Sequence, residues 1–113
     1  MKIHESVRIN GIEYEVLDET PSLNDGTHML CGEIRYQDSV ICISDVLKSH
    51  QMKCITLWHE ILHGIRESSG IEIENEEAVV EMFARGIYQV LQDNGGRFFD
   101  LVSKEISEDK CNE

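Results

Sequence analysis

Two histidines four residues apart, set in a helical apolar pattern, constrain this chain more than any other feature. His59 and His63 enclose Glu60 in the run His-Glu-Ile-Leu-His. Around them, apolar residues recur every three or four positions, at Met52, Ile55, Trp58, Leu62 and Ile65. This spacing predicts an amphipathic helix. Since helical side chains four residues apart share one face, both imidazoles are expected side by side.

Capping residues indicate where this first helix begins and ends. Its regular pattern starts at Met52, and Ser49 or Asp45 could cap its first turn. Gly70 follows two serines and is expected to end it, because glycine readily adopts the left-handed conformation found after helices. The two histidines therefore fall well inside the predicted helix.

A second helix is predicted over residues 76–92. Its apolar residues are Ala78, Val79, Met82, Phe83, Ile87, Val90 and Leu91. The run Asp-Asn-Gly-Gly at 93–96 is expected to stop it. Apolar residues in 97–106 predict a short third helix that closes the core, and 107–113 is expected to be a frayed, flexible tail.

The first 44 residues are typical of short strands. An Asn-Gly pair at 10–11, flanked by alternating apolar residues, predicts a β-hairpin over 6–17. Residues 18–27 contain the only proline and are expected to form a loop. Two further strands, over 29–36 and 39–44, flank a polar turn.

These segments predict a single α+β domain spanning residues 1–113, strand-rich over 1–44 and helical over 45–106. A chain of 113 residues supports one hydrophobic core. We expect a small antiparallel or mixed sheet, followed by two helices that hold a metal between them and by the short C-terminal helix.

Charge and composition exclude several partners. The chain has 22 acidic and 10 basic residues, a net charge of −12, so nucleic acid and anionic membranes are not expected to bind. No signal peptide or membrane-spanning run is present in the sequence, which favours a cytoplasmic protein. The four cysteines show no Cys-x-x-Cys spacing and are expected to be reduced thiols.

The His-Glu-x-x-His pattern has a chemical reason. Two imidazoles one helical turn apart can hold one zinc ion at about 2.0–2.1 Å. Zinc lowers the pKa of a bound water toward about 7. Glu60, at the edge of the same face, could accept the proton of that water and later pass it to a leaving amine. His59 and His63 are therefore candidate metal ligands, and Glu60 a candidate general base.

A catalytic zinc site needs a third protein ligand, and the second helix offers two. Glu77 and Glu81 lie four residues apart and hence on one face. One of them could bind the metal while the other orients a zinc-bound histidine through its free ring nitrogen. Glu74 and Glu76 are interpreted instead as solvated charges near the start of the helix, where its dipole favours acids.

The run from His59 to Gly64, together with Glu76 to Ala84, resembles the ImmA/IrrE-type family of small bacterial and phage zinc metallopeptidases, in the gluzincin branch of the zincins. The likeness covers roughly residues 30–92. Alignment on Phe83-Ala84 places the family's ligand glutamate at Glu77. The resemblance implies a minimal zincin-like fold and a phage or prophage member.

We therefore expect a zinc-dependent metallopeptidase that acts on a peptide or protein substrate. His59, His63 and Glu77 would bind zinc, with Glu81 as the alternative third ligand, and Glu60 would be the catalytic base. The alternative is a non-catalytic zinc-binding module with a regulatory or protein-interaction role. The sequence does not determine an oligomeric state.

Overall fold

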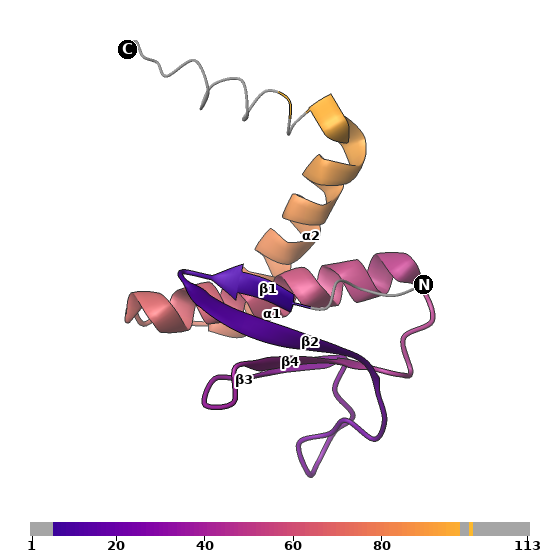
Figure 1. Ribbon diagram of the computed structural model, residues 1–113, viewed down its shortest axis with the longest axis vertical. Coiled ribbons are helices and arrows are strands. Elements are labelled where there is room, and N and C mark those ends of the chain that lie inside the picture. Colours follow the sequence, from indigo (N-terminus) through magenta and orange to yellow (C-terminus); the bar gives the residue numbers. More distant parts are fainter. Residues whose placement is uncertain (1–5, 98–99, 101–113) are drawn as a thin grey trace.

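Four strands and two helices follow one another in the computed structural model, which describes residues 6–97 and 100 (Figure 1). They are β1 Ser6–Ile9, β2 Ile12–Thr20, β3 Gly32–Arg35, β4 Val40–Ser44, α1 His50–Ser69 and α2 Glu76–Asn94. The predicted α+β class is confirmed. The third helix predicted over 97–106 lies outside the described residues except at Arg97 and Asp100, and the predicted tail over 107–113 lies wholly outside them.

The Asn-Gly turn forms the predicted hairpin. Asn10 and Gly11 both have positive φ, at 49° and 89°, as a two-residue turn of type I′ requires. β1 and β2 pair antiparallel on either side of this turn.

The loop predicted from residue 18 begins later, because β2 continues to Thr20. The pairing of β2 with β4 shifts register between Leu17 and Thr20, and Glu19 there has a φ of 57°. Lys53 of α1, only 5% exposed, places its Nζ 3.3 Å from Asp18 and 2.9 Å from Glu19. These two ion pairs hold the end of β2 against α1, where the sequence alone indicated a loop.

The sheet has the order β1-β2-β4-β3, with β2 and β4 parallel and the other pairs antiparallel. This is the expected mixed sheet. β3 and β4 are the two further predicted strands and pair antiparallel, although β3 begins at Gly32 rather than at residue 29. Because β3 pairs only with β4, it is an edge strand of the sheet.

The core lies between the sheet and α1. Its buried sheet residues are Ile9, Tyr14, Val16, Ile41 and Ile43, and Leu57 and Ile61 of α1 pack against them. Gly64 of α1 permits the close contact, since a Cβ there would lie 2.9 Å from Ile9 Cδ1. Cys31, Cys42 and Cys54 are free thiols, as expected for these three positions.

The caps of α1 decide between the two N-cap candidates and confirm the expected end of the helix. The Ser49 hydroxyl accepts a hydrogen bond from the Met52 backbone N–H at 3.2 Å, so Ser49 rather than Asp45 caps the helix. Gly70 ends it in the left-handed conformation, with a φ of 75°. No helix in the described part of the chain is long and apolar enough to cross a membrane.

α2 packs against α1 and, among the described elements, against no other. It projects away from the sheet beyond α1 (Figure 1). Its buried residues are Val80 and Ala84. The N-terminal half of α2 thus lies over the histidines of α1.

Candidate metal centre

Three side chains from the two helices converge on one point. Nε2 of His59 and Nε2 of His63 are 3.2 Å apart. Glu77 of α2 places Oε2 3.0 Å from His59 Nε2 and Oε1 2.8 Å from His63 Nε2. The structure therefore brings together the three residues that the sequence indicates as ligands.

The donor set fits a metal ion. In a tetrahedral site with bonds of about 2.0–2.1 Å, ligand atoms lie about 3.3 Å apart. The nearest contacts among these three side chains are 2.8–3.2 Å, the two to Glu77 being made by different oxygens, and one ligand atom from each residue lies within 4.8 Å of the others. The group could hold a metal ion, and two imidazoles with one carboxylate suit several transition metals. The side chain of Glu77 is 77% exposed, so the group opens to solvent.

A carboxylate of α2 contacts the other nitrogen of each imidazole. Glu81 Oε1 lies 2.7 Å from His59 Nδ1, and Glu76 Oε2 lies 2.6 Å from His63 Nδ1. An ionised carboxylate can only accept, so Nδ1 of each ring must donate. In a neutral imidazole the proton then stays on Nδ1, and Nε2 presents its lone pair toward Glu77. Glu81 thus occupies the orienting position that was predicted for whichever glutamate is not the ligand.

The interpretation of Glu76 as a solvated charge is wrong. Its side chain is only 23% exposed, and it contacts both His63 and Arg66. The reason is the crossing of the helices, which turns the first residue of α2 toward α1. Sequence spacing indicated only its place at the helix start. Glu74, two residues before Glu76, is exposed, as expected.

Each orienting carboxylate is itself held by an arginine. Arg66 Nε lies 3.1 Å from Glu76 Oε1, and Arg85 Nε donates to Glu81 Oε2. The hydrogen bond with His63 lowers the pKa of Glu76, against the effect of burial and with the help of Arg66. Burial opposes the lowering of the Glu81 pKa, but the contacts with His59 and Arg85 outweigh it. Both groups are therefore ionised at neutral pH.

Glu60 is buried between α1 and the start of β3. It is 6% exposed, and its Oε2 would lie 3.2 Å from a Cβ built on Gly32. Burial raises the pKa of Glu60 to about 7, although the neighbouring His59 and His63 act to lower it. The pKa of His59 is raised in turn: burial lowers it, but the contact with Glu81 and the charge of Glu60 outweigh that effect.

A cavity of about 260 Å³ connects these groups. His59, Glu60 and Glu77 line its polar part, and the other walls come from α1, α2 and the segment 29–32 that leads into β3. Its apolar lining residues include Met29, Leu30, Met52 and Ile55. Glu60 thus shares one solvent-accessible space with two of the three candidate ligands without belonging to the ligand group.

Comparison with protein-family models, with curated proteins and with solved structures found no match.

Proposed function

We propose that this chain is a zinc-dependent peptidase of the ImmA/IrrE type. The observation that carries the proposal is the convergence of His59, His63 and Glu77 beside a cavity that also contains the buried carboxylate of Glu60. A purely structural zinc site usually has four protein ligands and no need of such an acid. Here three ligands leave a position for substrate chemistry.

His59 and His63 would bind the metal through Nε2, and Glu77 through its carboxylate. When bound, zinc would supply an acidified water and polarise the substrate carbonyl. Glu76 and Glu81 keep the two imidazoles in the orientation in which Nε2 faces Glu77. Since the side chain of Glu77 is exposed, the site can be reached by a substrate from solvent.

Glu60 would move the proton. Its carboxylate lines the cavity next to His59 and Glu77, so it can accept a proton from the attacking water. It would then donate that proton to the amine nitrogen that leaves when the peptide bond breaks. Because Glu60 lies outside the ligand group, its carboxylate is free for this role.

The edge strand β3 would bind the substrate. β3 pairs with β4 on one side only, and the segment that enters β3 forms a wall of the cavity. An extended peptide could add to this edge as a further strand, with main-chain hydrogen bonds holding its scissile bond near Glu60.

The test compares the zinc-loaded wild type with Glu60→Gln on a mixed peptide library read by mass spectrometry. Glu60→Gln should retain zinc and lose about 10²–10⁴-fold in hydrolysis rate, because it removes the proton carrier. Glu67→Gln, on an exposed position of α1, is the matched control and should cleave like the wild type. Cleavage by Glu60→Gln at the wild-type rate would refute the role of Glu60. A zinc-loaded wild type that cleaves nothing in the library would favour the non-catalytic module.

A further inference from the structure

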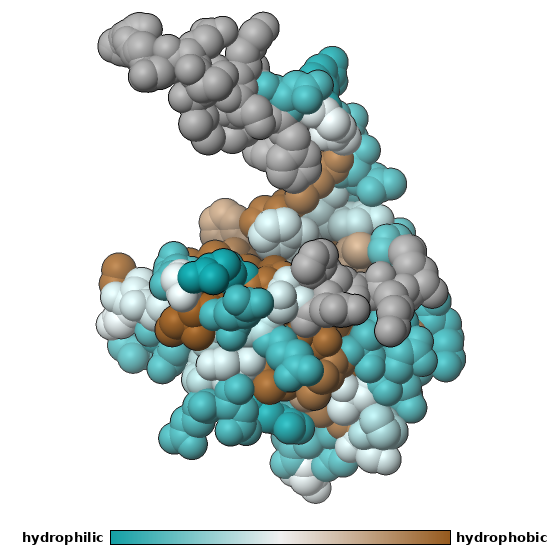
Figure 2. All heavy atoms as spheres, in the orientation of Figure 1, coloured by the Kyte–Doolittle hydropathy of each residue, from teal (hydrophilic) through white to brown (hydrophobic). Residues whose placement is uncertain are grey.

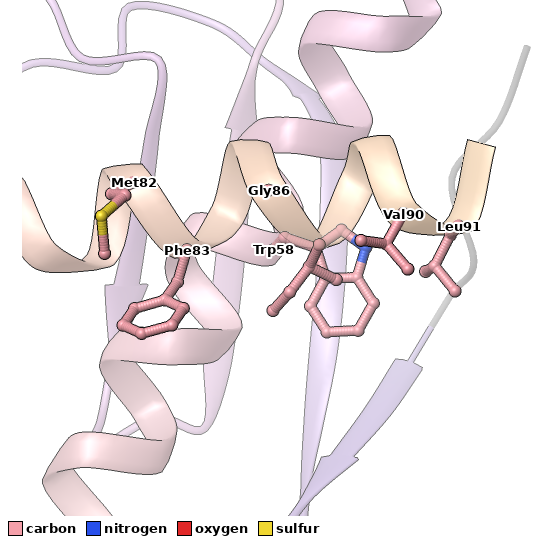
Figure 3. A pocket seen from close by; sticks show the side chains of 7 residues that line it. Trp58, Met82, Phe83, Gly86, Val90 and Leu91 are labelled. Carbon is pink, nitrogen blue, oxygen red and sulfur yellow. The ribbon is translucent and has the colours of Figure 1, made fainter. Parts of the chain in front are cut away.

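A second cavity, larger and apolar, lies along α2 from Met82 to Leu91. Its volume is about 560 Å³. The residues that line it include Trp58, Met82, Phe83, Ile87, Val90 and Leu91. Figure 3 shows the labelled side chains of Phe83, Val90 and Leu91 on one side of α2, beside the ring of Trp58. We call this cavity the α2 groove.

The groove is open in the described part of the chain. Met82 is 60% exposed, Phe83 52% and Val90 48%. Apolar residues gather along α2 where it rises from the body of the molecule (Figure 2). A contiguous apolar surface of this kind marks a site where another segment or molecule binds. The α2 groove is therefore expected to bind another segment of the chain or another molecule.

The chain that follows α2 has the composition of such an occupant. Residues 98–106 lie outside the described residues except for Asp100, but their sequence is amphipathic. Phe98, Phe99, Leu101, Val102 and Ile106 are apolar, whereas Asp100, Ser103, Lys104 and Glu105 are polar. At 100° per residue the five apolar positions lie within an arc of about 160° on a helix, and Glu105 is the one charged residue inside that arc. This is the segment for which the sequence predicts a third helix.

The junction and the length of the segment suit a return over the groove. Gly95, which ends α2, has a φ of 53° and a ψ of −135°, and a second glycine follows it. Only glycine adopts this conformation readily, and it turns the chain away from the axis of α2. A helix of the nine residues 98–106 would be about 13.5 Å long, and the groove from Leu91 back to Phe83 extends about 12 Å along α2. One such helix would therefore cover the groove.

We propose that residues 98–106 fold back and fill the α2 groove with their apolar side chains. A tethered segment has an effective concentration in the millimolar range, so it would outcompete a second copy of the chain at lower concentrations. The contact would hold α2 on α1 and thereby keep Glu77 and Glu81 over the histidines. The segment would act as a positioning clamp for the metal centre.

Trp58 makes the proposal testable, because it is the only tryptophan in the chain and lines the groove. We would measure its emission maximum and its quenching by acrylamide in Val102→Asp, at low micromolar protein. Val102 is central on the apolar face, so a charge there should release the segment. Emission should shift to the red, and the quenching constant should roughly double as Trp58 becomes accessible. Ser103→Asp adds the same charge at the neighbouring polar position and should leave both readouts unchanged.

Other outcomes would overturn the proposal. Equal quenching in the wild type and Val102→Asp would show that the segment does not cover Trp58. A wild type that is dimeric by light scattering, and that becomes monomeric in Val102→Asp, would assign the groove to a second copy. If Val102→Asp fails to fold by circular dichroism, Val102→Ala should still increase quenching relative to Ser103→Ala, and equal values would refute the clamp. None of these readouts depends on zinc or on peptidase activity.

Discussion

Each histidine of the metal centre is held at Nδ1 by a glutamate of α2, and each of these glutamates contacts an arginine. Arg85 forms an ion pair with Glu81, and Arg66 forms one with Glu76. These contacts determine which ring nitrogen faces Glu77, and so they prepare the imidazoles for a metal before it binds.

Removing either orienting charge should weaken the metal site without abolishing it. We expect Glu81→Gln and Glu76→Gln each to lower zinc affinity by about 10- to 100-fold, because the ring loses its fixed orientation and some basicity. Competition with a fluorescent zinc chelator would measure this. Glu74→Gln, an exposed glutamate of the same region, is the control. Affinities equal to that of Glu74→Gln would contradict an orienting role.

Spacing along one helix predicted most of this site. The period of α1 places His59 and His63 together, and the period of α2 indicates that Glu77 and Glu81 share a face. Glu76 could not be found in this way, because its contact with His63 depends on how α1 and α2 cross. That crossing follows from the packing of Val80 and Ala84 on α1 rather than from any local pattern.

The edge strand β3 lies close against α1 at Gly32. A Cβ at this position would lie 2.5 Å from Thr56 Cγ2 and 3.2 Å from the backbone oxygen of Cys42. The first distance is shorter than real contacts of a Cβ atom, and the second is tighter than most of them. The absence of a side chain at Gly32 therefore positions the start of β3, and with it one wall of the cavity that contains Glu60.

Gly32→Ala should consequently destabilise the fold. We expect the free energy of unfolding to fall by about 1–3 kcal/mol, because the added methyl overpacks the contact of β3 with α1. Urea denaturation followed by circular dichroism would measure it. Gly96→Ala, where a Cβ meets nothing within 4 Å, should change stability by less than about 0.5 kcal/mol. Equal stability of the two variants would contradict the close approach.

Local signals account for the elements that the sequence predicted well. The Asn-Gly turn, the Ser49 cap and the Gly70 terminator each act within a few residues. The parallel pairing of β2 with β4 is different, since it joins strands separated by β3. The extension of β2 to Thr20 likewise depends on Lys53, more than 30 residues away. Such long-range contacts leave no local pattern in the sequence.

Part of the acidic excess of the whole molecule is concentrated around the two histidines. Glu60, Glu76, Glu77 and Glu81 all lie at this site. A cluster of one sign raises the local concentration of counter-ions, here cations. Part of the net charge of −12 would therefore be offset by a bound divalent ion, while the rest keeps the surface acidic.

The metal content of the purified chain tests the central claim most directly. We expect one zinc per chain in the wild type by inductively coupled plasma mass spectrometry, because three ligand atoms already converge at the site. His63→Ala and Glu77→Ala should each lose this zinc, while His28→Ala, an exposed histidine, should retain it. A wild type without bound metal, or full retention of zinc in both ligand variants, would contradict the account.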